Sequence, residues 1–582
     1  MRFFTPTFEK IPDRPTLTVE AIDDTQEPAF RFRGYIYWPN RSEETKAWEY
    51  RQRAGGLPVD TRTSRHSFYG YVPPKKYFDS HPEWYPMGRD GKRHHGGAQG
   101  LCGTDRSLSR KFAENLLARI EKRPNRTIFR AGQGDGFTGC QCEKCRALVH
   151  REGTEAAPYI LLLNRVLEIT TKTHPDKGLI TFAYFDTLPA PRTLKPHENL
   201  WINVVSSALS RNQAGDQLNK IQGNPANRDY EKAIFDWCRL APGRVTIYHW
   251  DGLDPGNGEY CEWPNLFPHC DDIRLWHEAG VAGGHIASRI RNYNWSWLSN
   301  YVWHRLLWDP ETDENAAIRE FLNGYYGQKA GPVIWDYLNY VNTIRRESGY
   351  GAATVRWTSY PGIAREKMFT PAVTKKMKSF FDRALARAAD EKDPAYLEHV
   401  REAAATTLDQ ILIGQHVERS DAILPAKEPA TGNLWMVPGG DPGLIASLRR
   451  VLAQMNPQST GVHFARKTGG PLHRLNGTIF TLDVCPNLAG QITRLLYKPE
   501  DARILGANGN KLGYEDIFLR TYGQYWSVEE KTKNSIKTTV TLRPGRWVIR
   551  NAKVYRTVSF SEDDRSLKIE RRYQQRGGRR GD

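Results

Sequence analysis

Residues 129–145 read FRAGQGDGFTGCQCEKC, and this stretch decides the expected fold. A short apolar run, Thr127–Phe129, leads into a glycine-rich turn around Asp135, and a helix-like segment follows. An acidic residue on a loop between a strand and a helix is typical of β/α enzymes, which keep their reacting groups at the carboxyl ends of parallel strands. The stretch therefore predicts a β/α enzyme with Asp135 at its active edge.

The same alternation of strand and helix patterns extends on both sides of this stretch, from about residue 30 to 310. Strands are predicted at Phe32–Trp38, Ser67–Val72, Thr127–Arg130, Leu179–Phe185, Leu200–Val205, Arg244–Trp250 and Val281–Ile286. Helices are predicted between them at Leu108–Lys122, Ala156–Thr173, Asp229–Leu240 and Asp271–Ala279. Repeated alternation indicates a parallel sheet, and seven units in about 280 residues favour a (β/α)8 TIM-type barrel. The missing strand is expected within 50–66.

In the rest of the chain the sequence pattern changes from helical spacing to strand alternation. A chain of this length is expected to contain about two to four domains. Apolar spacings of three and four predict helices at Trp297–Trp308, Glu314–Tyr326, Pro332–Glu347, Ala372–Glu391 and Pro394–Glu418. Strand alternation then predicts an antiparallel β-sandwich, with runs at Thr478–Leu482, Gln491–Tyr497, Ile517–Thr521, Thr538–Leu542, Trp547–Tyr555 and Ser566–Tyr573. The expected domains are an N-terminal extension (1–29), the barrel (30–310), a helical domain (311–425), the sandwich (426–570) and a basic disordered tail (571–582).

Composition limits the kinds of partner that are expected for this protein. No run of apolar residues is long enough to predict a membrane span, and the start, MRFFTPTFEKIPDRP, lacks the apolar core of a signal peptide. The net charge of +17 is spread along the chain, and no helix-turn-helix, zinc-finger or RNA-recognition pattern accompanies it, so no nucleic-acid partner is expected. The 17 Trp and 27 Tyr suit stacking on sugar rings. The oligomeric state is left open.

Three carboxylates are candidates for catalysis. Asp135 follows the strand that ends at Arg130, and Asp251 and Glu259 follow the strand that ends in Tyr248-His249-Trp250. Paired carboxylates across a glycosidic bond are the usual machinery of sugar hydrolysis. We expect Asp135 to be one member of the pair and Glu259 to be the general acid, with Asp251 as the reserve. Turn formation or solvent exposure would also explain each acid.

Other polar and aromatic residues are expected to line the same mouth and bind a carbohydrate. Arginine binds carboxylate or sulfate in a forked geometry, so an acidic glycan is one candidate substrate. The alternatives are that the aromatic rings only pack at the rim and that the positive charge lies elsewhere. The predicted substrate-binding residues are Arg130, Tyr184, Asp186, Tyr248, His249, Trp250 and Arg289.

The cysteines at 102, 140, 142 and 145 allow three interpretations. Cys142 and Cys145 have zinc-ligand spacing, and Cys140 and Cys102 could complete four thiolates. One disulfide or plain buried thiols are the alternatives, and buried thiols without a metal are the expectation. No cofactor is therefore predicted. In each case the Cys-x-Cys-x-x-Cys run fastens the base of the loop that carries Asp135.

Several motifs, taken together, resemble the DUF4838 proteins, which include glycoside hydrolase family 163, described as endo-β-N-acetylglucosaminidases. The motifs are YFDSHPEWYPMGRDGKR (77–93), LCGTD (101–105), GDGFTGCQCEKCRAL (134–148), TFAYFDTLPAP (181–191), HEAGVAGG (277–284), YVWHRLLWDP (301–310) and FLNGYYG (321–327). The segment GQITRLLYKPEDARILG (490–506) resembles the β-supersandwich domains of carbohydrate-active enzymes.

The resemblance implies a barrel like that of family 20 hexosaminidases. It also implies glycan hydrolysis, with N-acetylhexosamine as a candidate sugar and its acetamido oxygen as a candidate nucleophile, and a secreted or periplasmic location. Where the family usually has an acidic residue after the last strand, this chain has Ala287-Ser288-Arg289. A non-catalytic carbohydrate-binding protein on the same barrel is therefore the alternative.

Overall fold

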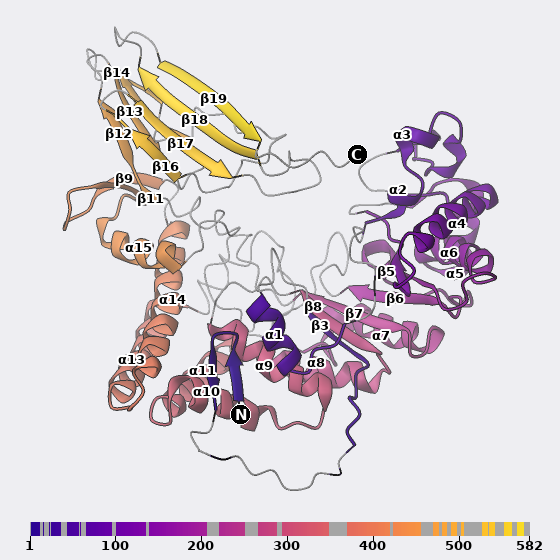
Figure 1. Cartoon of the computed structure of the whole chain (residues 1–582), viewed down its shortest axis with the longest axis horizontal. Coiled ribbons are helices and arrows are strands. Elements are labelled where there is room, and N and C mark those ends of the chain that lie inside the picture. The colour runs from indigo at the N-terminus through magenta and orange to yellow at the C-terminus, as the bar shows by residue number, and fades with distance from the viewer. Residues whose placement is uncertain are drawn as a thin grey trace. The chain divides into compact units, whose positions relative to one another are not determined.

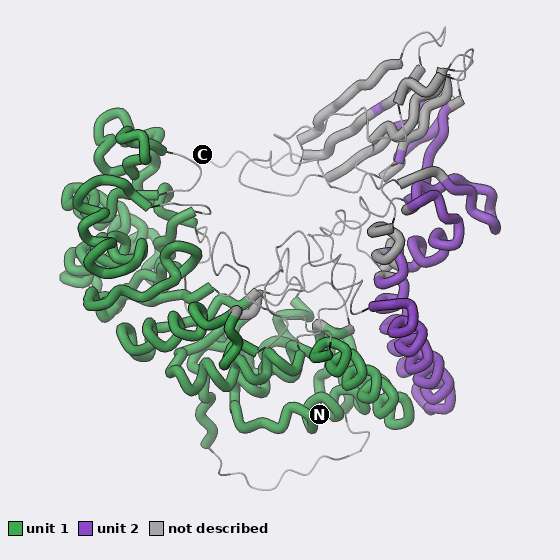
Figure 2. Tube along the Cα trace, turned by 180° about the vertical axis from the view of Figure 1, so that it is seen from behind, with its two compact units in different colours: residues 1–253, 263–357 green, residues 254–262, 358–582 purple. Residues whose placement is uncertain are grey.

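A computed structural model gives the fold. The residues it describes are 2–11, 16, 23, 25–35, 43–56, 59, 66–95, 100–134, 139–205, 220–250, 266–287, 294–347, 369–419, 423–454, 470–476, 480–485, 491–497, 502–505, 527–532, 535–541, 552–560 and 567–575. The chain divides into two compact units, residues 1–253 with 263–357 and residues 254–262 with 358–582 (Figure 2).

A parallel sheet forms the centre of the first unit. Its strands, in the spatial order β3-β8-β7-β6-β5-β4, are β3 (Phe32–Tyr35), β8 (Gly283–Ala287), β7 (Val245–Trp250), β6 (Leu200–Val205), β5 (Gly178–Ala183) and β4 (Ile128–Arg130). All five neighbouring pairs are parallel. Val59 adds a parallel bridge to Ile128, within the stretch where the sequence predicts the missing strand.

The sheet curls as a partial barrel. Its two edge strands, β3 and β4, contribute Phe32 and Ile128 to one buried cluster, which also includes Val59, Ile180 and Trp201. The Phe32 and Trp201 rings lie 5.4 Å apart edge to face, although β3 and β6 are not neighbours in the strand order. A flat sheet would hold these side chains too far apart to touch, so one face of the sheet is turned in on itself.

Alternation along the strands stacks the inward-facing side chains in layers. On β5, Ile180 belongs to the layer nearest the amino ends of the strands, and Phe182 and Tyr184 follow at every second position. Between these levels, Thr246 Oγ1 lies 3.1 Å from Asn203 Oδ1. At the carboxyl ends, Val205 and Tyr248 pack with Phe182 and Tyr184. Layered filling of this kind is the packing found inside parallel barrels.

Helices and a short hairpin complete the first unit (Figure 1). The hairpin pairs β1 (Arg2–Thr5) with β2 (Phe8–Lys10). The helices are α1 (Glu43–Arg51), α2 (Phe68–Tyr71), α3 (Pro74–Tyr77), η1 (Pro82–Trp84), α4 (Arg106–Glu121), α5 (Glu143–Glu152), α6 (Ala156–Thr170), η2 (Phe185–Thr187), η3 (Pro225–Asn227), α7 (Arg228–Leu240), α8 (Leu266–Glu278), α9 (Asn294–Trp308), α10 (Glu314–Tyr326) and α11 (Gly331–Glu347).

The second unit joins a helical segment to antiparallel sheets. Its helices are α13 (Pro371–Ala389), α14 (Pro394–Arg419), η5 (Pro442–Leu444) and α15 (Ile445–Gln454). One sheet has the order β11-β10-β9, with β9 (Ile423–Lys427), β10 (Leu434–Pro438) and β11 (Gly470–Pro471). A second runs β12 (His473–Asn476), β13 (Phe480–Cys485), β14 (Gln491–Tyr497) and β15 (Ala502–Leu505), and a third runs β16 (Ser527–Lys531), β17 (Ser535–Thr541), β18 (Ala552–Phe560) and β19 (Leu567–Gln575).

These findings confirm the α/β class, the curled parallel sheet, the helical segment and the antiparallel sheets that follow it. One predicted strand was wrong, because Phe68–Tyr71 is the helix α2. β19 continues to Gln575, so residues 571–575 of the expected tail lie in a strand, while the run Ile517–Thr521 lies outside the described residues. α10 and α11 belong to the compact unit of the sheet, and the predicted domain boundaries stay predictions. Among the helices whose residues are described, none is both long and apolar enough to cross a bilayer.

Candidate functional site

Two predicted sugar-binding aromatics meet at the carboxyl edge of the sheet. Tyr248, 8% exposed, forms a buried cluster with Val205, and the half-buried rings of Phe182 and Tyr184 pack against it. The Phe182 and Tyr184 rings lie 5.9 Å apart. Aromatic faces at the mouth of a parallel barrel are suited to stacking on a pyranose ring. The structure therefore brings Tyr184 and Tyr248 together.

A hydrogen-bonded hub fixes the loop that leads to Asp135. Gln133 Nε2 donates to Thr187 Oγ1 at 2.8 Å, and Thr187 Oγ1 donates in turn to the carbonyl of Tyr184 at 2.8 Å. From the other side, His66 Nδ1 lies 2.6 Å from the carbonyl of Gln133. The chain leading to Asp135 is thus tied to the end of β5 by a side chain that is 2% exposed.

The turn after β5 carries a strained residue. Phe185 has a φ of 53°, in the left-handed region that side chains other than glycine rarely adopt. Its ring lies 4.1 Å from that of Tyr184. Strain of this kind clusters at ligand sites, where the surrounding structure holds it in place. Asp186, the next residue, is the middle residue of η2 and is partly exposed.

The structure leaves several predicted site residues untested. Asp135, Asp251, Glu259 and Arg289 lie outside the described residues. Trp250 ends β7 at the carboxyl edge, but its side chain is also outside the described part. Arg130 is placed more fully. It ends β4 two residues after the inward-facing Ile128, so it shares the inner face of the sheet and is half-buried there.

His249 does not belong to the mouth, and its prediction as a substrate-binding residue is corrected by its position on β7. It lies one residue after Tyr248, so its side chain points to the opposite face of the strand, against α8. There it stacks on His269, with ring centroids 3.9 Å apart and an interplanar angle of 17°. Both rings are buried, and burial lowers the pKa of His249 well below its usual value and that of His269 to about 3.

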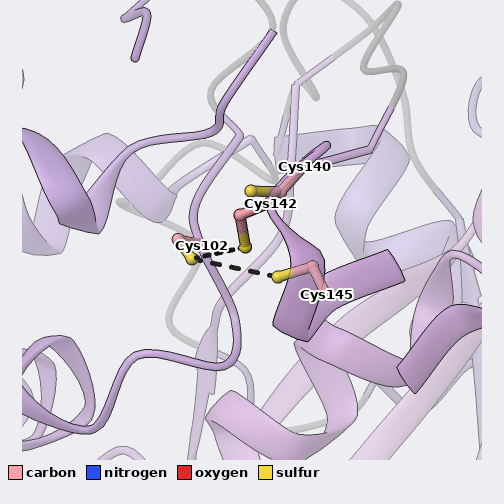
Figure 3. Close-up of side chains that lie close together, drawn as sticks. All are labelled: Cys102, Cys140, Cys142 and Cys145. Atoms are coloured by element: carbon pink, nitrogen blue, oxygen red, sulfur yellow. Dashed lines mark hydrogen bonds between the residues drawn. The ribbon is translucent and has the colours of Figure 1, made fainter. Parts of the chain in front are cut away.

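The four cysteines at 102, 140, 142 and 145 converge (Figure 3). Their Sγ atoms all lie within 4.8 Å of one another, with 3.6 Å between Cys102 and Cys142 and 3.8 Å between Cys102 and Cys145. Cys102 lies on the loop before α4, Cys142 caps the start of α5, and Cys145 lies in the first turn of that helix. No described cysteine forms a disulfide.

Charge within the cluster is shared unequally. Hydrogen bonds from the Cys140 and Cys145 thiols lower the pKa of Cys102, and the same hydrogen bonds, together with burial, raise the pKa of Cys140 to about 11 and also raise that of Cys145. The sequence had anticipated that Cys102 could approach the other three.

Sequence reasoning missed His66, Gln133, Phe182 and Thr187. The position of Phe182 could have been inferred, since it is two residues before Tyr184 in the same strand pattern and so shares its face. Gln133 and Thr187 offered no signal, because their hydrogen bond joins two loops 54 residues apart. His66 lay beside a segment whose predicted strand proved to be a helix.

A basic pocket of about 780 Å³ lies away from this mouth. It is lined by residues that precede β3, by Arg53 and its neighbours at the end of α1, and by the carboxyl end of α9 with Arg305 and Trp308, so it is at the amino edge of the sheet. Its arginines already have protein partners. Arg305 Nη1 is 2.6 Å from Glu320 Oε2, and the Arg53 guanidinium lies 4.4 Å from the centre of the Trp308 ring. The pocket is therefore not a candidate for the carbohydrate site.

Comparison with known proteins gives a family without a defined activity. No curated protein matches this chain. A solved structure, 4-alpha-glucanotransferase from Thermococcus litoralis, aligns with 10% identity over 82% of this chain and 83% of that one, at a TM-score of 0.15, a likeness too slight to inform fold or function. The model for DUF4838, a domain of unknown function, matches residues 3–339, which is more than half of the chain. This protein therefore belongs to the DUF4838 family.

Proposed function

We propose that this protein is a glycoside hydrolase that cleaves a polysaccharide or glycan, with N-acetylhexosamine as the candidate sugar at the cleaved bond. The curled sheet would be part of a complete (β/α)8 barrel, and the antiparallel sheets would form a separate β-sandwich. One observation carries the proposal. Tyr184 packs against the buried cluster of Tyr248 and Val205 at the carboxyl edge of the parallel sheet, beside the fixed loop that leads to Asp135.

The chemistry would use carboxylates from two loops. Asp135 follows β4 and Glu259 follows β7, and the carboxyl ends of parallel strands share one edge of a sheet. Glu259 would protonate the glycosidic oxygen, with Asp251 as the alternative acid. Asp135 would orient the acetamido group of the substrate, whose oxygen would attack the anomeric carbon. The hydrogen bond between Gln133 and Thr187 would hold the loop that leads to Asp135 in a fixed position relative to Tyr184 and Tyr248.

The substrate would carry acidic groups if the mouth is basic. Arg130 lies on the inner face of β4, one strand away from Tyr184, and Arg289 follows β8 in the sequence. A guanidinium can bind a carboxylate or sulfate with two parallel hydrogen bonds. The Arg130→Gln variant should then lose activity on acidic oligosaccharides and keep activity on neutral ones of equal length.

A panel of defined glycans with mass-spectrometric readout tests the proposed activity. Wild-type protein should release products of fixed mass, and Asp135→Asn and Glu259→Gln should each lower turnover roughly 10²–10⁴-fold. Asp176→Asn is the matched control, because Asp176 is exposed and precedes β5 at the amino edge of the sheet. All variants should keep the unfolding midpoint of the wild type.

Two results would contradict the assignment. Near-wild-type turnover of Asp135→Asn or Glu259→Gln on a substrate with a poor leaving group would remove that residue from catalysis. Saturable glycan binding with no product from any member of the panel would instead support the carbohydrate-binding alternative, for which Ala287 at the end of β8 is the motivating feature.

A further inference from the structure

We propose that Cys102, Cys140, Cys142 and Cys145 bind one Zn²⁺ ion as four thiolates, and that this ion fastens the loop carrying Asp135. The site is independent of the proposed hydrolase activity, because it uses none of the residues assigned to catalysis. It would be a structural centre, since four sulfur ligands complete a tetrahedral shell and leave no position for a substrate.

The sulfur separations match a tetrahedral zinc site. Zinc–sulfur bonds of about 2.3 Å in a tetrahedron place sulfurs about 3.8 Å apart. Cys102 Sγ lies 3.6 Å from Cys142 Sγ and 3.8 Å from Cys145 Sγ, and all four sulfurs lie within 4.8 Å of one another. A disulfide requires about 2.05 Å, which these pairs do not approach. An iron–sulfur cluster would put iron and sulfide between the thiolates and spread them further apart.

Figure 3 shows the four side chains directed into a common space from separate parts of the backbone. Cys102 approaches from the loop before α4, while Cys140, Cys142 and Cys145 come from the segment that starts α5. Three of the thiols are almost fully buried, with 4%, 3% and 0% exposure for Cys102, Cys140 and Cys145. Four thiols in contact are weak partners for one another, whereas a thiophilic cation would satisfy all of them.

Groups around the sulfurs are those that a negatively charged zinc–thiolate centre needs. The backbone N–H of Met87 donates to Cys140 Sγ at 3.3 Å, and Thr104 Oγ1 lies 3.2 Å from Cys145 Sγ. The Arg93 guanidinium donates to Cys140 Sγ at 3.7 Å. Hydrogen bonds to ligand atoms orient them and disperse their charge. The positive guanidinium of Arg93 would offset part of the net negative charge of four thiolates around Zn²⁺.

The position of the cluster explains what the metal would do. Cys102 and Cys142 are 40 residues apart, and the chain between them contains α4, β4 and, in the sequence, Asp135. An ion bound to both would close this segment into a loop and fix residues 140–142, which lead into α5. Closing a long loop restricts the unfolded chain, and metal binding is then coupled to folding.

Metal analysis of the full chain tests the site. The protein is expressed with zinc in the medium, purified without chelator, and measured by native mass spectrometry and elemental analysis. We expect one zinc per chain. Cys145→Ser should lower the zinc content at least tenfold. Cys270→Ser is the matched control and should keep one zinc, because Cys270 is a buried lone thiol on α8 that donates to the carbonyl of Leu266.

A second measurement needs no variant and covers the case that Cys145→Ser fails to fold. A mercurial thiol reagent added to the wild-type protein should release one zinc as four thiols react together. The proposal is overturned if the zinc-supplemented protein contains no zinc, if iron replaces zinc at the same stoichiometry, if Cys102 and Cys142 are found as a disulfide, or if Cys145→Ser retains one zinc.

Discussion

Two buried clusters of potential metal ligands in the same unit behave in opposite ways. At the start of α5, four thiols point toward a common space, the Met87 N–H donates to Cys140 Sγ, and Thr104 Oγ1 lies 3.2 Å from Cys145 Sγ. Behind β7, His249 and His269 stack face to face, and their ring nitrogens make no hydrogen bond among the described residues, although Asp272 Oδ2 lies 3.7 Å from His269 Nδ1. The two clusters are similarly buried, so burial does not distinguish them.

The difference lies in the direction of the lone pairs. An imidazole binds a metal in the plane of its ring, and two rings at 17° to each other and 3.9 Å apart direct their nitrogens side by side rather than toward a common point. Trp303 meets His269 edge to face at 4.3 Å and closes the cluster. The histidines therefore act as neutral packing groups, whereas the thiols form a site. Convergence of donor atoms, and not their density, separates a ligand site from a core.

The largest expected effect is the loss of stability of the first unit when the cysteine cluster is disrupted. Cys145→Ser should lower the free energy of unfolding of the first unit by more than about 4 kcal/mol, because it removes both a metal ligand and the cross-link between two loops. Chemical denaturation of wild type and variant, with equal zinc, measures it. Cys270→Ser should change stability by much less, and equal losses in the two variants would reduce the cluster to ordinary packing.

The histidine pair should instead make the protein sensitive to acid. Burial lowers the pKa of His269 from 6.5 to about 3. Between these pH values His269 is protonated in the unfolded chain but neutral in the folded protein. Stability is therefore full above pH 6.5 and falls as the pH drops from 6.5 toward 3. Between pH 7.5 and 5.0 the loss is roughly 2 kcal/mol for such a histidine.

A phenylalanine at position 269 isolates this effect. His269→Phe keeps an aromatic ring beside Trp276 and Trp303 but cannot be protonated, so its stability should fall less with acid than that of the wild type. His150→Gln, at an exposed position on α5, is the control and should leave the pH dependence unchanged. If His269→Phe and the wild type lose stability in parallel, His269 is protonated in the folded protein.

A smaller effect is expected at the other end of α5. Burial raises the pKa of Glu152, but backbone hydrogen bonds from Thr193 at 2.9 Å and Leu194 at 3.0 Å outweigh it and lower the pKa to about 2. This carboxylate stabilises the fold above pH 4.5, and the contribution is lost as the pH falls toward 2.

Glu152→Gln should therefore cost about 1–3 kcal/mol at neutral pH, because an amide group would face backbone donors. The zinc content should not change, since Glu152 is at the carboxyl end of the helix whose start carries the cluster. Denaturation and metal analysis of the same sample measure both. Loss of zinc would mean that α5 moves as a whole and that the cluster is not an independent anchor.

Local patterns predicted the sheet well but could not predict contacts between loops. The strands from Ile128–Arg130 to Gly283–Ala287 follow apolar runs that are visible in the sequence. The run Ser67–Val72 has the aromatic content of a strand, yet Ser67 Oγ and Tyr71 Oη both donate to the carbonyl of Arg130, and this tertiary anchoring selects the helix α2. At the candidate site, too, the local alternation along a strand could be read from the sequence, whereas the contacts between loops could not. Alternation places Tyr184 and Tyr248 on the inner side of the sheet, where their role in sugar binding stays a prediction, and it also shows why His249, between Tyr248 and Trp250, points away from that side.

X-ray absorption at the zinc edge of the purified full chain tests the central claim most directly. The account predicts zinc with a first shell of four sulfur atoms at about 2.3 Å and no nitrogen or oxygen ligand. A first shell of nitrogen and oxygen, or a protein without zinc, would contradict the assignment of Cys102, Cys140, Cys142 and Cys145 as a metal centre.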